Sequence, residues 1–252
     1  MCSSVSADLV FVLDNSGSIR DTNPDDGSYD NFELLLNFVV DIIDVLDIGG
    51  GGDVLQDTRV GLVEFSDSAR NVFYLNTFSN KAQIQDAVRA LEYIGGNTNT
   101  SGGLLLMQEE QFRIQNGDRP EVANVAIVIT DGQSTYDANL TIPYAESAHS
   151  AGIQIFSVGI TDEINEAELR AIASPPQQIN QNYFTSVDFQ SLSLIANAVA
   201  DETCIIVEQG GICCIGHAGF RFSVQLSLRL VARYTCILSP FLVPWRDLSS
   251  FL

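Results

Sequence analysis

Positive charge is scarce in this sequence. Its 252 residues include 12 Lys and Arg against 32 Asp and Glu, which gives a net charge of −20 at pH 7. No basic patch stands out along the chain. The sequence therefore does not favour a partner with a phosphate backbone, and nucleic acid is not an expected ligand.

Residues that hydrolases commonly use are also missing. The only histidines are His149 and His217, and the Gly-x-Ser-x-Gly motif of serine hydrolases does not occur. The main enzymatic alternative is a phosphatase-like hydrolase, whose site also begins with an aspartate after a strand, as at Asp14. That chemistry requires a second acid two residues later, where this chain has Ser16. It also requires a catalytic lysine, and the only lysine, Lys81, lies on a predicted exposed helix. We therefore expect no enzymatic activity.

The chain lacks a hydrophobic run that suits a membrane span. Arg221, Arg229 and Arg233 interrupt every window of adequate length in the apolar C-terminal region. The first residues, 1–4, have neither the basic start nor the apolar core of a secretory signal. If the protein is secreted, we expect this sequence to be a mature or incomplete form.

Cysteine is rare and unevenly placed. Cys2 and Cys204 enclose a long segment without cysteine, and three more follow, Cys213, Cys214 and Cys236. In an oxidising compartment a disulfide between Cys2 and Cys204 would close the domain at its ends, stabilising it by about 4–5 kcal/mol in the chain-entropy model. Spacing alone supports two unrelated thiols equally well. The odd total leaves at least one thiol unpaired or bonded to another chain.

Charge divides the chain near residue 204. Residues 1–204 carry 30 Asp and Glu and 8 Lys and Arg, whereas residues 205–252 carry 2 and 4. We predict one domain over 1–204 and an atypical tail over 205–252. The tail has one alternating stretch, 220–230, with few neighbours to pair with. Poor order, or an origin outside the native fold, is the preferred interpretation, and a surface hairpin is the alternative.

Apolar periodicity predicts strands that alternate with helices over residues 1–204. Consecutive apolar residues, as in 9–13, are typical of strands buried on both faces. Polar loops are expected at 19–31 and 95–103. Strands are expected at 9–13, 59–65, 69–75, 122–130, 153–160 and 182–185, and helices at 32–46, 81–93, 104–115, 143–150, 166–173 and 189–200. The predicted fold is α/β, a doubly wound and mostly parallel six-stranded sheet with one antiparallel edge strand and helices on both faces.

Polar side chains follow the strands at the points where a parallel sheet forms its sites. Asp14, Ser16 and Ser18 come after the first strand, Asp131 follows a later one, and Thr98 lies in a polar loop before a helix. Because sites form outside the carboxyl ends of strands where the winding reverses, we expect these oxygens to converge. Two carboxylates and three hydroxyls suit Mg²⁺, with Mn²⁺ or Ca²⁺ as alternatives, and leave a coordination position free. The other possibility is a motif without metal, satisfied by helix N-termini and loops.

The spacing Asp14-x-Ser16-x-Ser18, with Thr98 and Thr130-Asp131-Gly132, resembles the metal-ion-dependent adhesion site of von Willebrand factor type A domains. The likeness covers residues 5–204, and further matching stretches are 60–66, 95–100 and 152–160. The chain is most similar to the extracellular-matrix members, such as matrilins and non-fibrillar collagens. The small helix that collagen-binding integrin inserts add after the strand at 153–160 is absent.

The resemblance implies a role for each residue of the motif. Ser16 and Ser18 would bind the cation directly through their hydroxyls, and Thr98 directly or through water. Asp14 and Asp131 would act mostly through water. The implied function is an extracellular adhesion or matrix-binding module whose cation coordinates a Glu or Asp of a matrix or cell-surface protein, with collagen among the candidates. The alternative is a structural, self-associating matrix module with an idle metal site.

An extracellular location follows from the same resemblance, since flanking cysteines such as Cys2 and Cys204 are common in extracellular members. Asn139-Leu140-Thr141 is a glycosylation sequon, which agrees with secretion. The stretch from Asn99 to Ser101 also fits the sequon pattern. A glycan at Asn99 would obstruct the proposed metal site, so Asn139 is the preferred candidate.

Overall fold

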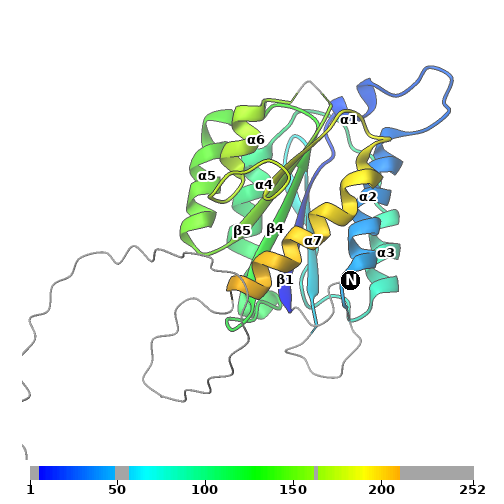
Figure 1. Ribbon diagram of the computed structural model, residues 1–252. Helices are drawn as coiled ribbons and strands as arrows, with labels where there is room; N and C mark the ends of the chain where they lie inside the picture. The colour runs from blue at the N-terminus through cyan, green and yellow to red at the C-terminus, as the bar shows by residue number, and fades with distance from the viewer. Residues whose placement is uncertain (1–5, 49–56, 162–163, 211–252) are drawn as a thin grey trace, which may run out of the picture. The chain divides into compact units, whose positions relative to one another are not determined.

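Six β-strands form one mixed sheet at the centre of the fold, in the order β3-β2-β1-β4-β5-β6 (Figure 1). Neighbouring strands are parallel except β2 and β3, which are antiparallel. The strands are β1 (Ala7–Asp14), β2 (Arg59–Phe65), β3 (Ala69–Phe73), β4 (Ala123–Thr130), β5 (Gln154–Ile160) and β6 (Tyr183–Ser186). The predicted fold class, including the antiparallel edge strand, is confirmed.

The computed structural model describes residues 6–48, 57–161 and 164–210. All of them belong to one unit, Met1–Cys213. The predicted tail at 205–252 lies outside the described residues, except that the last helix continues as far as Gly210. The domain boundary at residue 204 therefore stays a prediction.

Helices cover both faces of the sheet (Figure 1). One face carries α2, α3 and α7, and the other carries α4, α5 and α6. In the described part of the chain the α-helices are α1 (Ser18–Asp21), α2 (Asn31–Val45), α3 (Lys81–Arg89), α4 (Thr100–Leu106), α5 (Ala138–Ser150), α6 (Glu166–Ile172) and α7 (Leu192–Gly210). A π-helical turn, η1 (Met107–Gln111), and a 3₁₀ turn, η2 (Ile114–Asn116), follow α4.

Burial on both faces explains the unbroken apolar run of β1. Leu9 and Phe11 pack into the core under α2 and α7, whereas Val10 and Val12 pack into the core under α4 and α5. All eight residues of β1 are buried. Strands covered on both faces read as continuous hydrophobic segments, so the sequence pattern follows from the central position of β1.

Several predicted boundaries are wrong. The expected loop at 19–31 begins with helix α1, and the expected helix at 81–93 ends at Arg89. The helix expected at 143–150 begins at Ala138 and includes Pro143 within it. Its buried residue Thr141 donates a hydrogen bond from Oγ1 to Ser134 Oγ at 3.0 Å, which ties this early turn to the loop before it.

Helix α4 begins within the expected polar loop at 95–103. Asn99 caps it, because its Oδ1 accepts a hydrogen bond from Gly102 N at 2.8 Å. At Gly103 a Cβ atom would lie 2.8 Å from Phe65 Cδ1 and 3.0 Å from Val12 Cγ1. A glycine at this position lets α4 approach the sheet directly below the polar loops.

A buried ion pair fixes the opposite end of β1. Arg119 donates to Asp8 Oδ1 from Nε at 2.8 Å and from Nη2 at 2.6 Å, and its backbone N–H donates to Asp8 Oδ2 at 2.6 Å. Asp8 is fully buried and Arg119 is 6% exposed. Removing one partner of such a pair leaves the other charge buried without compensation.

We expect Arg119→Met to lower the free energy of unfolding by about 3–5 kcal/mol, since it leaves the Asp8 carboxylate unpaired in the interior. Chemical denaturation measures this change. The control is Arg113→Met, which removes an exposed pair with Glu110 and is expected to change stability by less than about 1 kcal/mol. Equal unfolding midpoints for the two variants would contradict the assignment.

Candidate metal centre

The candidate site lies at the carboxyl edge of the sheet, where β1 and β4 end side by side. Leu13 of β1 pairs with Ile129 of β4 in parallel register, so the loops that follow them leave the sheet together. Helix α2 returns the chain to β2 on one side of β1, and β4 lies on the other side. This reversal of strand order is the position at which doubly wound sheets place their binding sites.

The five predicted residues form one hydrogen-bonded group at this edge. Thr98 Oγ1 donates to Ser16 Oγ at 3.2 Å, and the hydroxyls of Ser16 and Ser18 are hydrogen-bonded at 3.1 Å. Ser18 Oγ donates to Asp131 Oδ1 at 2.7 Å. Three loops that are far apart in sequence therefore contribute oxygens to one cluster.

Asp14 lies below this chain of oxygens and orders its first loop. One carboxylate oxygen, Oδ1, accepts a hydrogen bond from Ser16 N at 2.9 Å, and the other accepts from Thr130 Oγ1 at 2.6 Å. The side chain is fully buried, and this burial raises the pKa of Asp14, opposed by the hydrogen bonds from Ser16 and Thr130. Because both of its carboxylate oxygens accept hydrogen bonds, Asp14 fixes the start of the loop that carries the Ser16 and Ser18 hydroxyls.

Backbone hydrogen bonds hold Thr98 in place. Its N–H donates to Thr135 Oγ1 at 2.9 Å, and its carbonyl accepts from Thr135 N at 3.0 Å and from Tyr136 N at 3.2 Å. The next residue, Asn99, donates from its backbone N–H to Ser66 O at 3.0 Å. The Thr98 loop is therefore anchored to the loop after β4 and to the end of β2.

The loop after β1 is held against the Thr98 loop in a similar way. Gly17 N donates to Gly96 O at 2.9 Å, and Tyr93 donates from its hydroxyl to Gly17 O at 3.0 Å. A Cβ atom at Gly17 would lie 3.1 Å from Gly96 O, closer than side chains ordinarily come. The glycine between the two serines thus permits the close contact of the two loops.

The spacing of the hydroxyls fits a small divalent cation. Neighbouring octahedral ligands around Mg²⁺ are about 2.9 Å apart, as its metal–oxygen distance requires, and Ca²⁺ accepts a wider range of ligand spacings. The observed separations of 3.1 and 3.2 Å lie slightly above the Mg²⁺ value. Within the described residues no three His, Cys, Asp or Glu side chains form a metal-binding group, so any metal here relies on hydroxyls.

Two side chains of this arrangement were not assigned a role from the sequence. Thr130 orients Asp14, and Thr135 fixes Thr98 through a backbone hydrogen bond. Thr130 is the last residue of an apolar strand, and this position in the sequence was the signal that could have indicated its contact with the site. Thr100 is buried, and its hydroxyl has no hydrogen-bond partner among the residues that the structure describes, so it is not part of the cluster.

The other predicted sites have different outcomes. Cys204 is disulfide-bonded, but the four other cysteines lie outside the described residues, so pairing with Cys2 stays a prediction. Asn139 is exposed on α5, and its glycosylation stays a prediction. Asn99 is only 8% exposed, and its amide is used in the cap of α4 and in a bond to Asp67 O. A glycan at Asn99 is incompatible with this arrangement.

Two hollows occur near the edges of the sheet. One hollow, of about 510 Å³, is lined by Thr161 and Ser186 among others. Thr161 Oγ1 donates a hydrogen bond to Asp131 O at 3.3 Å, so this hollow lies next to the candidate site.

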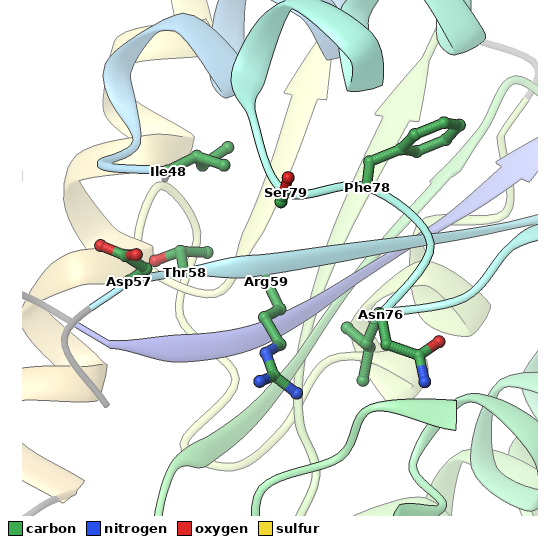
Figure 2. Close-up of a pocket in the computed structure, with 8 residues that line it drawn as sticks. Ile48, Asp57, Thr58, Arg59, Asn76, Phe78 and Ser79 are labelled. Atoms are coloured by element: carbon green, nitrogen blue, oxygen red, sulfur yellow. The ribbon is translucent and has the colours of Figure 1, made fainter. Parts of the chain in front are cut away.

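The other hollow, of about 210 Å³, lies at the start of β2, at the end of the sheet opposite the candidate site. Its lining residues are drawn in Figure 2. There Arg59 and Asn76 lie below β2, and Arg59 donates to Gly117 O at 2.7 Å. None of the predicted site residues lines this second hollow.

The family model of the von Willebrand factor type A domain matches residues 8–198. The chain belongs to the von Willebrand factor type A (VWA) family. The match covers the whole candidate site and all six strands apart from Ala7, the first residue of β1. The resemblance inferred from the sequence motifs is thereby confirmed.

Matrilins and a collagen are among the relatives of this VWA domain. Human matrilin-1 is 34% identical over 230 residues, which are 91% of this chain and 42% of matrilin-1. The collagen alpha-1(XII) chain of Notophthalmus viridescens is 33% identical over 205 residues, which are 81% of this chain and 20% of that protein. The chain therefore spans less than half the length of these relatives.

A solved structure shows a metal in the corresponding motif of another VWA protein. Proximal thread matrix protein 1 from the mussel byssus, with zinc in its metal-ion-dependent adhesion site, superposes with a TM-score of 0.70. It is 26% identical, and the match covers 80% of this chain and 48% of that one. Matrilin-like VWA domains are adhesion modules and not enzymes, so the chain belongs to a non-enzymatic family. Among the described residues, no helix combines the length and apolar character that a membrane span requires.

The raised pKa of Asp14 predicts how pH affects cation binding. Burial holds the pKa of Asp14 in the folded domain above its value in the unfolded chain. As the pH rises from the unfolded to the folded pKa, the metal-free domain therefore loses stability, because the carboxylate ionises more readily in the unfolded chain. A bound cation favours the ionised form, and at acid pH protons compete with it. We expect Mg²⁺ to raise the unfolding temperature more at about pH 7.5 than at about pH 5, as measured by thermal unfolding with Mg²⁺ or EDTA. Equal shifts at both pH values would contradict the account.

Proposed function

We propose that this VWA domain binds a divalent cation, with Mg²⁺ as the preferred candidate. Through this cation it would bind a carboxylate of an extracellular matrix protein. The observation that carries the proposal is the cluster of Thr98, Ser16, Ser18 and Asp131 oxygens, linked at 2.7–3.2 Å on top of buried Asp14. When bound, the cation supplies an electrophilic centre that accepts a carboxylate oxygen.

The exposure of the cluster supports access by a partner. Ser16, Thr98 and Asp131 are buried, whereas Ser18 is half-buried and Gln133 is exposed. Tyr136, the residue after Thr135, is 49% exposed, and Thr135 Oγ1 accepts the hydrogen bond from Thr98 N. Exposed side chains therefore lie next to the Thr98 loop. Ser18 is the member of the cluster that solvent reaches most, and a partner would approach from its side.

The composition of the cluster suits an acidic partner. Hydroxyls carry no charge. The site would therefore neutralise less of the charge of a divalent cation than a site built only from carboxylates. The domain itself is strongly acidic, and it would repel a carboxylate without the local charge of the ion. A Glu or Asp on a matrix protein is the ligand that this arrangement favours.

An extracellular location agrees with two independent observations. Cys204 is disulfide-bonded, and disulfides persist mainly in oxidising compartments. Matrilin-1 and the collagen XII chain, two of the matched relatives, are matrix proteins. We infer that Cys2 is the partner of Cys204, which would join the two ends of the predicted domain.

Calorimetric titration with Mg²⁺ and Mn²⁺ tests the metal site. We expect the wild-type domain to bind, and Asp131→Asn to weaken binding by about tenfold or more, because it removes a carboxylate that positions Ser18. The control is Glu146→Gln, which removes one carboxylate on the surface of α5 and is expected to leave affinity unchanged. Absence of binding by the wild type would refute the metal site.

Binding to matrix protein tests the second half of the proposal. We expect immobilised domain to retain protein from a matrix extract in Mg²⁺ but not in EDTA. Retention is also expected to disappear when the carboxylates of the extract have been converted to amides, because the cation then lacks its acidic ligand. Equal retention in EDTA would instead favour a structural, self-associating module.

A further inference from the structure

A third carboxylate, that of Glu64, lies beside the candidate metal centre and is not one of its five predicted residues. Glu64 is near the end of β2 and pairs with Leu13 of β1, one residue before Asp14. Its side chain is fully buried. A buried carboxylate is costly unless its oxygens are paired and hydrogen-bonded, so its contacts indicate what it does.

Both oxygens of Glu64 have a partner. Oε1 forms an ion pair with Arg70 Nε at the start of β3. Oε2 accepts a hydrogen bond from Asn15 Nδ2 at 3.0 Å. The Arg70 side chain is 60% exposed, so solvent screens this pair and its contribution to stability is modest. The contact with Asn15 is buried and leads directly to the loop after β1.

Asn15 lies between Asp14 and Ser16 and joins that loop to the segment before Thr98. Its Nδ2 also donates to Glu92 O at 3.0 Å, and its Oδ1 accepts from Ile94 N at 2.9 Å. Its backbone carbonyl accepts from Gly95 N at 3.0 Å. The amide can satisfy these partners only with Nδ2 directed at Glu64 and Oδ1 directed at Ile94.

We propose that Glu64 is a positioning residue of the metal site and acts through Asn15. Its carboxylate fixes the orientation of the Asn15 amide, and Asn15 in turn sets the distance between the loop that carries Ser16 and the loop that carries Thr98. Arg70 holds the carboxylate in this position from the solvent side. The inference rests on the proposed function, because it assumes that the site binds a cation.

The competing interpretation is an ion pair that stabilises the fold and nothing else. The chain offers a matched case in Asp8 and Arg119, a buried carboxylate–guanidinium pair at the opposite end of β1. Both acids are fully buried, and only Glu64 contacts the site loops. Asp8→Asn is therefore the control for the loss of a buried charge.

The experiment measures Mg²⁺ affinity by calorimetry, and stability in EDTA by denaturation, for five proteins: wild type, Glu64→Gln, Asn15→Ala, the double variant, and Asp8→Asn. We expect Glu64→Gln to weaken Mg²⁺ binding by about tenfold, the scale on which second-layer partners of metal ligands act. Asn15→Ala is expected to weaken it at least as much, and the double variant no more than Asn15→Ala alone. Asp8→Asn is expected to lose stability and keep wild-type affinity.

Three outcomes would overturn the inference while the wild type still binds Mg²⁺. These are wild-type affinity in Glu64→Gln, effects of Glu64→Gln and Asn15→Ala that add in full, and an equal loss of affinity in Asp8→Asn. If Glu64→Gln does not fold, wild-type affinity in Asn15→Ala alone refutes the positioning role. Absence of Mg²⁺ binding by the wild type refutes the proposed function instead, and the inference with it.

Discussion

The parallel pairing of β1 with β2 on one side and β4 on the other is the constraint on which the site depends. It buries every residue of β1 and brings Asp14 to the same edge as the loop after β4. The loop that carries Thr98 then joins the group through Gly96 and Asn99, which bond to the loop after β1 and to the end of β2. No single loop holds enough oxygens for a cation, and the order of the strands assembles them.

The hydrogen-bonded layer below the site determines its character. Asp14 is engaged on both oxygens, and Thr98 is fixed by its own backbone. The hydroxyls of Ser16 and Ser18 consequently have little conformational freedom. This lowers the entropy cost of binding a ligand. Glu64 belongs to the same layer, because it holds the residue between Asp14 and Ser16.

Much of the fold was predictable from the sequence, because apolar runs and polar breaks record the burial of the strands. The run 9–13 indicated a central strand, and the break at Asp131 indicated a second strand end beside it. Helix boundaries were less predictable, because side-chain caps and contacts set them and the apolar periodicity does not record those contacts. Asn99 caps the start of α4, and Thr141 in the first turn of α5 donates a hydrogen bond to Ser134 in the loop before that helix.

The supporting contacts of the site were hidden from sequence reasoning, because they join residues that are far apart in the sequence. Glu64 and Asn15 are 49 positions apart, and each alone is an ordinary residue of a strand or a turn. The convergence of Asp14, Thr98 and Asp131 was predictable because each follows or precedes a recognisable element. The network around them became visible only in three dimensions.

The central claim is that a cation binds among the hydroxyls of Ser16, Ser18 and Thr98. Crystals of the domain grown with Mn²⁺, with diffraction data collected at the manganese absorption edge, test it most directly. We expect an anomalous peak within bonding distance of the Ser16 and Ser18 hydroxyls, and its loss in Asp131→Asn crystals. A map without a peak there, or with its strongest peak at another place on the domain, would contradict this claim.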